Sequence, residues 1–180
     1  MTGKPPLDYR WTLCVVGGID RIPGFVSLFR GNGLHIAAIV DVQQGQKQKI
    51  ENATKSLKEN HLLTQNTFAG QDEADIEDVL GRVFFRALLT KSLDLRPPHE
   101  FPTDKPGGAP SRIAKEADDF AATLPPHYSE FNHFVPARWL FEHKDEGKTL
   151  DGYDEALKRM GTLIAAANAL MEPSGPIPPK

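Results

Sequence analysis

Runs of apolar residues separated by polar segments predict alternating strands and helices over the first half of the chain. Compact apolar runs at 11–18 ("WTLCVVGG"), 34–41 ("LHIAAIVD") and 61–69 ("HLLTQNTFA") have the length and composition of buried strands. Helical spacing of apolar residues predicts helices over 20–33, over 46–60 and from about 74 to 93. This order of strands and helices indicates an α/β layer built on a parallel sheet.

Individual residues add detail to these elements. Asp20 is a candidate N-cap of the first helix, and Pro23 suits its first turn. Cys14 lies inside the first apolar run, where a buried and unreactive thiol is expected. The residues expected on the buried side of the third helix are Ile76, Val79, Leu80, Val83, Phe84 and Leu88.

The pattern changes near residue 96, where proline and glycine become dense. Beyond this stretch, apolar spacing predicts only helices, over 111–124, from 136 to about 144, and over 151–171. We therefore predict an α/β domain over 9–95, a linker over 96–110, a helical domain over 111–172 and a disordered tail over 173–180.

Composition and charge narrow the class of protein. The 180 residues carry a net charge of -3 and 39% hydrophobic residues, which is ordinary for a globular domain and gives no overall basic field. A single cysteine cannot form an intrachain disulfide, and no apolar run approaches the ~20 residues that span a bilayer. We expect a cytoplasmic protein with no membrane partner.

Two acidic segments are candidates for chemistry. Asp41 follows a predicted strand directly, and "DEADIEDV" places five carboxylates near the start of a predicted helix. Ligand sites in open parallel sheets form outside the carboxyl ends of strands, and Mg²⁺ prefers oxygen ligands. The two segments would form a cation site if they converge. Acidic residues at a helix start are also ordinary capping and dipole partners, so this alternative stays open.

Other motifs are less specific. The glycine pair in "VVGGIDRIP" matches neither dinucleotide nor P-loop patterns, and a structural turn is the default interpretation. The histidines have no zinc-like spacing, and His133 between phenylalanines is expected to be packed or hydrogen-bonded. Basic residues suit either a phosphate backbone or a solvated face; those of the second half are Arg112, Lys115, Lys144 and Lys148.

Three segments together resemble a known family. "RWTLCVVGGIDRIPGFVSLF", "IAAIVDVQQGQKQKIEN" and "FAGQDEADIEDVL" are similar, in order and spacing, to the C-terminal Toprim region of OLD-family (overcoming-lysogenisation-defect) ATP-dependent endonucleases. "FNHFVPARWL" resembles the helical segment that follows Toprim there, so the similarity covers most of 9–142. The resemblance implies a Toprim-like parallel sheet flanked by helices, followed by an all-helical C-terminal segment.

The resemblance also implies a function. It predicts a DNA endonuclease that depends on Mg²⁺ or Mn²⁺, with Asp41 matching the first aspartate of a D-x-D pair. "EADIED" matches the downstream acidic cluster. The implied catalytic residues are Asp41, Asp75 and Glu77, and the implied metal ligands are Asp41, Glu73, Asp75, Glu77 and Asp78. Lys115 or Lys148 is a candidate for stabilising charge in the transition state.

The chain also departs from the family pattern. Gln43 stands where the second aspartate is expected, and neither the early strand with its glutamate nor the ATPase half is present. We therefore expect an incomplete Toprim domain with weak or no activity as an isolated fragment. Its expected partners are DNA, an ATPase domain or chain outside this sequence, and a second copy in a homodimer. The alternatives are a non-catalytic DNA-binding or assembly module and, more weakly, a flavodoxin-like ligand domain.

Overall fold

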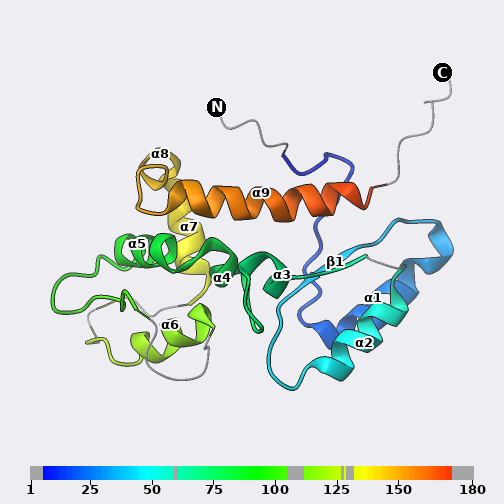
Figure 1. The fold of residues 1–180 in the computed structure, drawn as a ribbon, viewed down its shortest axis with the longest axis horizontal. Coiled ribbons are helices and arrows are strands. Elements are labelled where there is room, and N and C mark those ends of the chain that lie inside the picture. Colours follow the sequence, from blue (N-terminus) through cyan, green and yellow to red (C-terminus); the bar gives the residue numbers. More distant parts are fainter. Residues whose placement is uncertain (1–5, 59–60, 105–111, 127, 129–131, 172–180) are drawn as a thin grey trace. The chain divides into compact units, whose positions relative to one another are not determined.

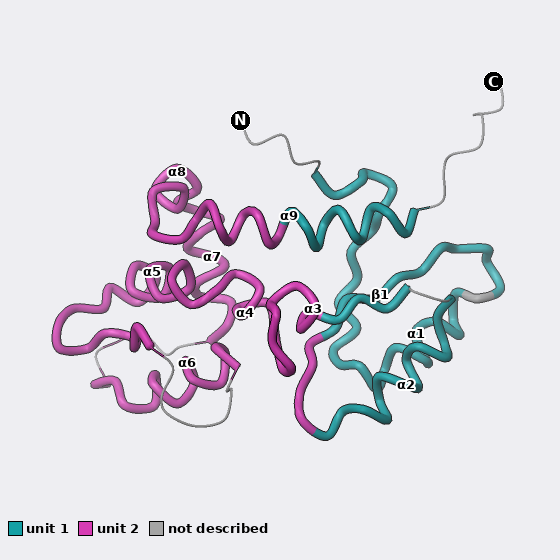
Figure 2. Tube along the Cα trace, viewed as in Figure 1, with its two compact units in different colours: residues 1–40, 45–64, 161–180 teal, residues 41–44, 65–160 magenta. Residues whose placement is uncertain are grey.

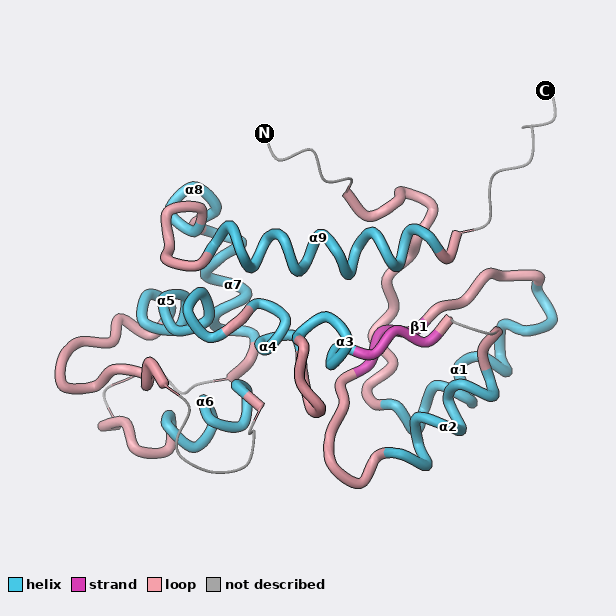
Figure 3. Tube along the Cα trace, viewed as in Figure 1, coloured by secondary structure: helices cyan, strands magenta, loops and turns pink. Residues whose placement is uncertain are grey.

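A computed structural model of the chain describes residues 6–58, 61–104, 112–126, 128 and 132–171. Within them the fold is mixed α/β, with a small parallel sheet and helices over much of the remaining chain (Figure 1, Figure 3), which confirms the predicted α/β class. The chain forms two compact units (Figure 2). Unit 1 contains residues 1–40, 45–64 and 161–180, and unit 2 contains 41–44 and 65–160.

Unit 1 holds the sheet. Strands β1 (Ala38–Val40) and β2 (Leu62–Thr64) pair in parallel, with Ala38 opposite Leu62, and helix α2 (Lys47–Ser56) connects them. Helix α1 (Ile22–Phe29) lies beside α2 (Figure 1). Short 3-10 turns, Ile19–Arg21 and Arg30–Asn32, flank α1. Helices and sheet share one apolar core, whose buried members are Ile19, Ile22, Val26, Val40 and Ala53.

Unit 2 is helical in its described part. Its helices are α3 (Gln65–Ala69), α4 (Ile76–Leu80), α5 (Arg82–Ser92), α6 (Ile113–Ala121), α7 (Phe134–Glu142) and α8 (Lys144–Gly147), followed by the first part of α9 (Tyr153–Ala169). Two adjacent faces of α5 pack into different apolar clusters: Phe85 and Leu89 join Phe101 and Ile113, and the neighbouring face joins a second cluster. The second cluster has buried members Phe84, Leu88 and Ala156.

Helix α9 contributes to both units. Its residues up to 160 belong to unit 2, and those from 161 belong to unit 1. The end of α9 is tied to the start of the chain, because the Asp8 backbone N–H donates to Asn168 Oδ1 at 2.8 Å. The predicted long C-terminal helix is therefore present, and each unit is built from separate stretches of sequence.

The strand predicted over 11–18 is wrong. Residues 11–16 have no regular secondary structure, and the side chains of Leu13 and Val15 are 79% and 102% exposed. Cys14 is exposed as well, which corrects the expectation of a buried thiol. A strand needs a partner for its backbone hydrogen bonds, and within the described residues the sheet contains only β1 and β2.

Two helix predictions need correction. Asp20 makes no capping bond; it lies inside the 3-10 turn, and its carboxylate is 3.6 Å from Lys49 Nζ. The long helix expected from about 74 is split at Gly81, whose positive φ of 84° ends α4 before α5 begins. This break turns Ile76 and Val83 toward solvent, with exposed fractions of 36% and 62%.

The predicted domain limits near residues 95 and 111 both lie inside unit 2. In the proline-rich segment 96–110, residues 96–104 are described and include Phe101, which is 1% exposed in the core of unit 2. The remainder of that segment, Ser111 at the expected start of the next helix, and the predicted tail over 173–180 lie outside the described residues.

Candidate functional site

Asp41 and Val42 follow β1 in the sequence, and Val42 pairs with Ala74 of the acidic segment 72–79. Val42 and Ala74 form an antiparallel bridge, in which Val42 N–H donates to the Ala74 carbonyl at 2.8 Å and Ala74 N–H donates back at 3.0 Å. In such a bridge the residue before one member lies opposite the residue after the other, so Asp41 lies beside Asp75. The two acidic segments converge in unit 2, as expected.

Four carboxyl groups make up this acidic cluster: Asp41, Asp75, Glu77 and Asp78. Asp75, Glu77 and Asp78 are buried, with exposed fractions of 4%, 7% and 6%, whereas Asp41 reaches the surface. Glu73 is half-buried. The charged groups that act on Asp41 are Glu77, Arg112, His133 and Asp78.

Two members of the acidic cluster cap the short helix α4. Asp75 is the N-cap: Asp78 N–H donates to its Oδ1 at 3.3 Å, and its own N–H donates to Asp78 Oδ2 at 3.1 Å. The other oxygen of Asp78 accepts from Ile113 N–H at 3.2 Å, at the start of α6. Such reciprocal bonds satisfy backbone donors that a helix start leaves unpaired. The capping role kept open for "DEADIED" is therefore present for these two residues.

Two basic side chains, Arg112 and His133, reach the acidic cluster from distant parts of the chain. Arg112 Nη1 donates to Asp75 Oδ2 at 3.2 Å, across 37 residues of sequence. His133 Nδ1 lies 3.1 Å from Glu77 Oε1, across 56 residues, and its Nε2 lies 3.7 Å from Asp118 Oδ1. His133 is thus hydrogen-bonded, as expected. Nothing in the sequence pattern connected either residue to the acidic segment.

Burial and neighbouring carboxyls disfavour the ionised form of two members of the cluster, Asp75 and Asp41. The pKa of Asp75 is raised from 3.8 to about 9, first by burial and then by the carboxyls of Asp78 and Glu77. These effects outweigh the nearby Arg112, so Asp75 keeps its proton at neutral pH. The pKa of Asp41 is also raised, by desolvation and then by Glu77, while Arg112 and His133 lower it.

The acidic cluster offers carboxyl oxygens as ligands for a divalent cation. Carboxylate oxygens are the ligands that Mg²⁺ and Mn²⁺ prefer. Among the residues the structure describes, however, no three His, Cys, Asp or Glu side chains are placed to hold a metal ion together. The cluster matches a divalent cation in ligand type, while Asp75 keeps its proton at neutral pH and both Asp75 and Asp78 are committed to capping.

The lysines proposed for charge stabilisation have other surroundings. Lys148 Nζ is 2.7 Å from Asp145 Oδ1, which raises the pKa of this lysine, and Lys115 is an exposed residue of α6. The cation in direct contact with the acidic cluster is Arg112. Gln43 is half-buried.

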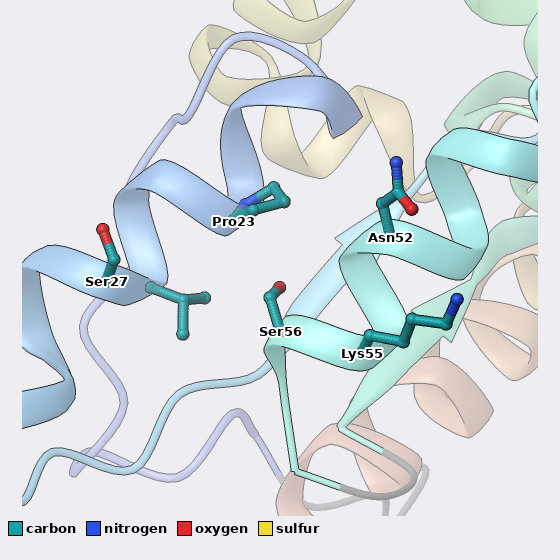
Figure 4. Close-up of a pocket in the computed structure, with 6 residues that line it drawn as sticks. Pro23, Ser27, Asn52, Lys55 and Ser56 are labelled. Atoms are coloured by element: carbon teal, nitrogen blue, oxygen red, sulfur yellow. The ribbon is translucent and has the colours of Figure 1, made fainter.

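A separate cavity lies between α1 and α2 in unit 1 (Figure 4). Its volume is about 300 Å³, and its lining residues are Pro23, Val26, Ser27, Asn52, Lys55 and Ser56. The lining contains one cation and no carboxylate, and the Ser27 and Ser56 hydroxyls donate to carbonyls of their own helices. The cavity therefore offers no cation site.

Comparisons with known proteins indicate neither a family nor a function for the chain. The chain matches no protein family, no curated protein and no solved structure. In the described part of the chain, no helix combines the length and apolarity needed to cross a bilayer.

Proposed function

We propose that unit 2 binds a divalent cation, Mg²⁺ or Mn²⁺, at the acidic cluster and hydrolyses phosphodiester bonds in DNA. One observation carries this proposal: Asp41, at the end of β1, lies beside a buried carboxyl group whose pKa is raised to about 9 by burial and neighbouring carboxyls. The proposed substrate, DNA, is taken from the resemblance to the Toprim region of OLD-family endonucleases. Asp41, Asp75 and Glu77 are the proposed catalytic residues.

The residues of the cluster have separable roles in this proposal. A bound cation would supply the positive charge that a scissile phosphate requires. Exposed Asp41 is the first carboxylate that an incoming cation meets, and His133 fixes the Glu77 carboxylate through its Nδ1. Arg112 provides a fixed cation from α6 next to Asp75. Because Gln43 brings no charge, we expect slow hydrolysis.

The present hydrogen bonds favour a second candidate. Asp75 and Asp78 bond to each other's backbone, and Arg112 and Ile113 occupy further oxygens. A cluster that caps itself in this way can join α4 to α6 without any metal ion. In that case the chain is a non-catalytic DNA-binding or assembly module.

Metal titration separates the two candidates. We expect Mn²⁺ to raise the melting temperature of the chain, and the rise to be lost in Asp41→Asn and Glu77→Gln. These substitutions keep shape and remove charge. Asp72→Asn is the matched control, because Asp72 is an exposed acid of the same segment outside the cluster. The wild-type chain should also nick supercoiled plasmid with Mn²⁺.

The outcomes are distinct. Loss of both the thermal shift and the nicking in Asp41→Asn, with Asp72→Asn unaffected, supports the proposal. A thermal shift without nicking favours the non-catalytic module. Nicking that survives Asp41→Asn and Glu77→Gln rejects the acidic cluster as its source.

A further inference from the structure

One face of α7 presents aromatic rings to solvent. Phe134, Arg138 and Phe141 follow one another at helical spacing, and the exposed fractions of the two phenylalanines are 81% and 71%. The Arg138 side chain is 80% exposed. We call these three residues and Lys144, the first residue of α8, the aromatic stripe.

The opposite face of α7 explains why the stripe stays outside. Pro136 is buried, Trp139 and Leu140 pack against the cluster that contains Phe84, and Val135 packs against the cluster that contains Phe85. The helix is therefore anchored on its other sides. Apolar packing within unit 2 does not account for two nearly bare phenyl rings on this face.

Cations lie next to these rings. Lys144 Nζ is 4.5 Å from the centroid of the Phe141 ring. Arg138, one turn after Phe134, pairs within the described residues with the carboxylate of Glu142 at 3.4 Å. Residues 132–144 contain two Lys or Arg residues and one acidic residue, although the whole chain has a net charge of -3. The acidic residues that follow the stripe, Asp145 and Glu146, are paired with Lys148 and Lys91, each at 2.7 Å.

We propose that the aromatic stripe binds single-stranded nucleic acid. Aromatic rings that alternate with basic side chains suit this ligand, because unpaired bases stack on the rings while cations meet the phosphates. Seven residues of helix separate the two phenylalanines by about 10 Å, so each ring takes a different base. In a duplex the faces of the bases are covered by neighbouring base pairs and cannot stack on the two phenyl rings.

This inference rests on the proposed function only for the class of ligand, a nucleic acid, and needs no metal ion. The binding test is therefore done in EDTA, using the full chain and a fluorescently labelled oligothymidylate followed by anisotropy. Asp72→Asn, at an exposed acid outside both the acidic cluster and the stripe, should bind as the wild type does. Failure of one proposal is then distinguishable from failure of the other.

Ring substitutions test stacking directly. Phe134→Leu and Phe141→Leu keep an apolar side chain and remove the aromatic face, and each should weaken binding by about fivefold or more. Phe134→Tyr and Phe141→Tyr keep the ring and should bind as the wild type does. Leu28→Ala removes a 72% exposed apolar side chain from α1 and should change nothing.

Charge substitutions test the phosphate contacts. Arg138→Ala with Lys144→Ala should reduce the slope of log affinity against log salt concentration by about 1.4, as expected for two phosphate contacts on a single strand. Circular dichroism and melting temperature show whether each variant is folded.

Three results would overturn the inference: no binding by the wild type at low salt, equal binding by the leucine and tyrosine variants, or an unchanged salt slope. Light scattering and vesicle flotation complete the test. If the leucine variants change self-association or binding to anionic vesicles while oligonucleotide binding is unchanged, the stripe serves another partner.

Discussion

Replacing Asp75 by asparagine should change how the stability of the protein depends on pH. Asp75 is 4% exposed, and its pKa is raised from 3.8 to about 9. Between these values the folded protein keeps a proton that the unfolded chain releases. The stabilisation from Asp75 is therefore complete below pH 3.8 and is lost progressively as the pH rises toward 9.

The size of the effect follows from one proton. A group that is protonated only in the folded state changes the free energy of unfolding by a little over 1 kcal/mol per pH unit, so the wild type should lose about 3 kcal/mol from this group between pH 6 and pH 8. Asparagine has no proton to release and caps helices as well as aspartate does. Asp75→Asn should lack this loss, so its free energy of unfolding should increase relative to that of the wild type as the pH rises.

Urea unfolding in EDTA at pH 6, 7 and 8 measures this difference. The control is Asp72→Asn, which removes an exposed acid three residues earlier and should leave the wild-type pH dependence unchanged. If the curves of wild type and Asp75→Asn run parallel from pH 6 to pH 8, Asp75 is ionised in the folded protein. That result would refute a protonated Asp75 in the folded protein at neutral pH.

Three further predictions concern packing and charge in unit 2. Leu89→Ala should lower the free energy of unfolding, measured by chemical denaturation, by about 2–5 kcal/mol because Leu89 is 0% exposed. Val83→Ala, on the exposed side of α5, is the control and should change it by less than about 0.5 kcal/mol. Gly81→Ala should destabilise by about 2 kcal/mol, measured in the same way, since its φ is 84° and a Cβ would meet the Arg159 guanidinium that bonds the Val79 and Leu80 carbonyls. Arg112→Ala should cost about 1–3 kcal/mol and raise the affinity for Mn²⁺ in calorimetry, because the cluster loses its guanidinium; equal or weaker Mn²⁺ affinity would contradict this.

Local apolar patterns predicted part of the fold well. The strand that ends before Asp41, the helix over 47–56 and the long C-terminal helix all depend on periodicity or composition within a short window, and all three are present. The strand at 11–18 has an equally apolar sequence, but a strand also requires a partner. Apolarity alone cannot say whether another segment pairs with it.

The candidate site also contains residues that the sequence pattern suggested and residues that it did not. The rule that strand ends carry functional groups brought Asp41 and Asp75 into one hypothesis, and the Val42–Ala74 bridge places them together. Arg112 and His133 reach the cluster from 37 and 56 residues beyond their partners, because the packing of α6 and α7 brings them there. A single sequence carries no signal for contacts of that kind.

The shared helix α9 affects the order in which the chain can fold during synthesis. Residues 1–40 and 45–64 leave the ribosome first, but their unit also includes residues from 161 onward, among them Asn168, which receives the Asp8 N–H. Unit 2 is complete in sequence at residue 160. The later-made unit can therefore fold while the earlier-made one still waits for residues from 161 onward, so synthesis of the second part of α9 governs when unit 1 matures.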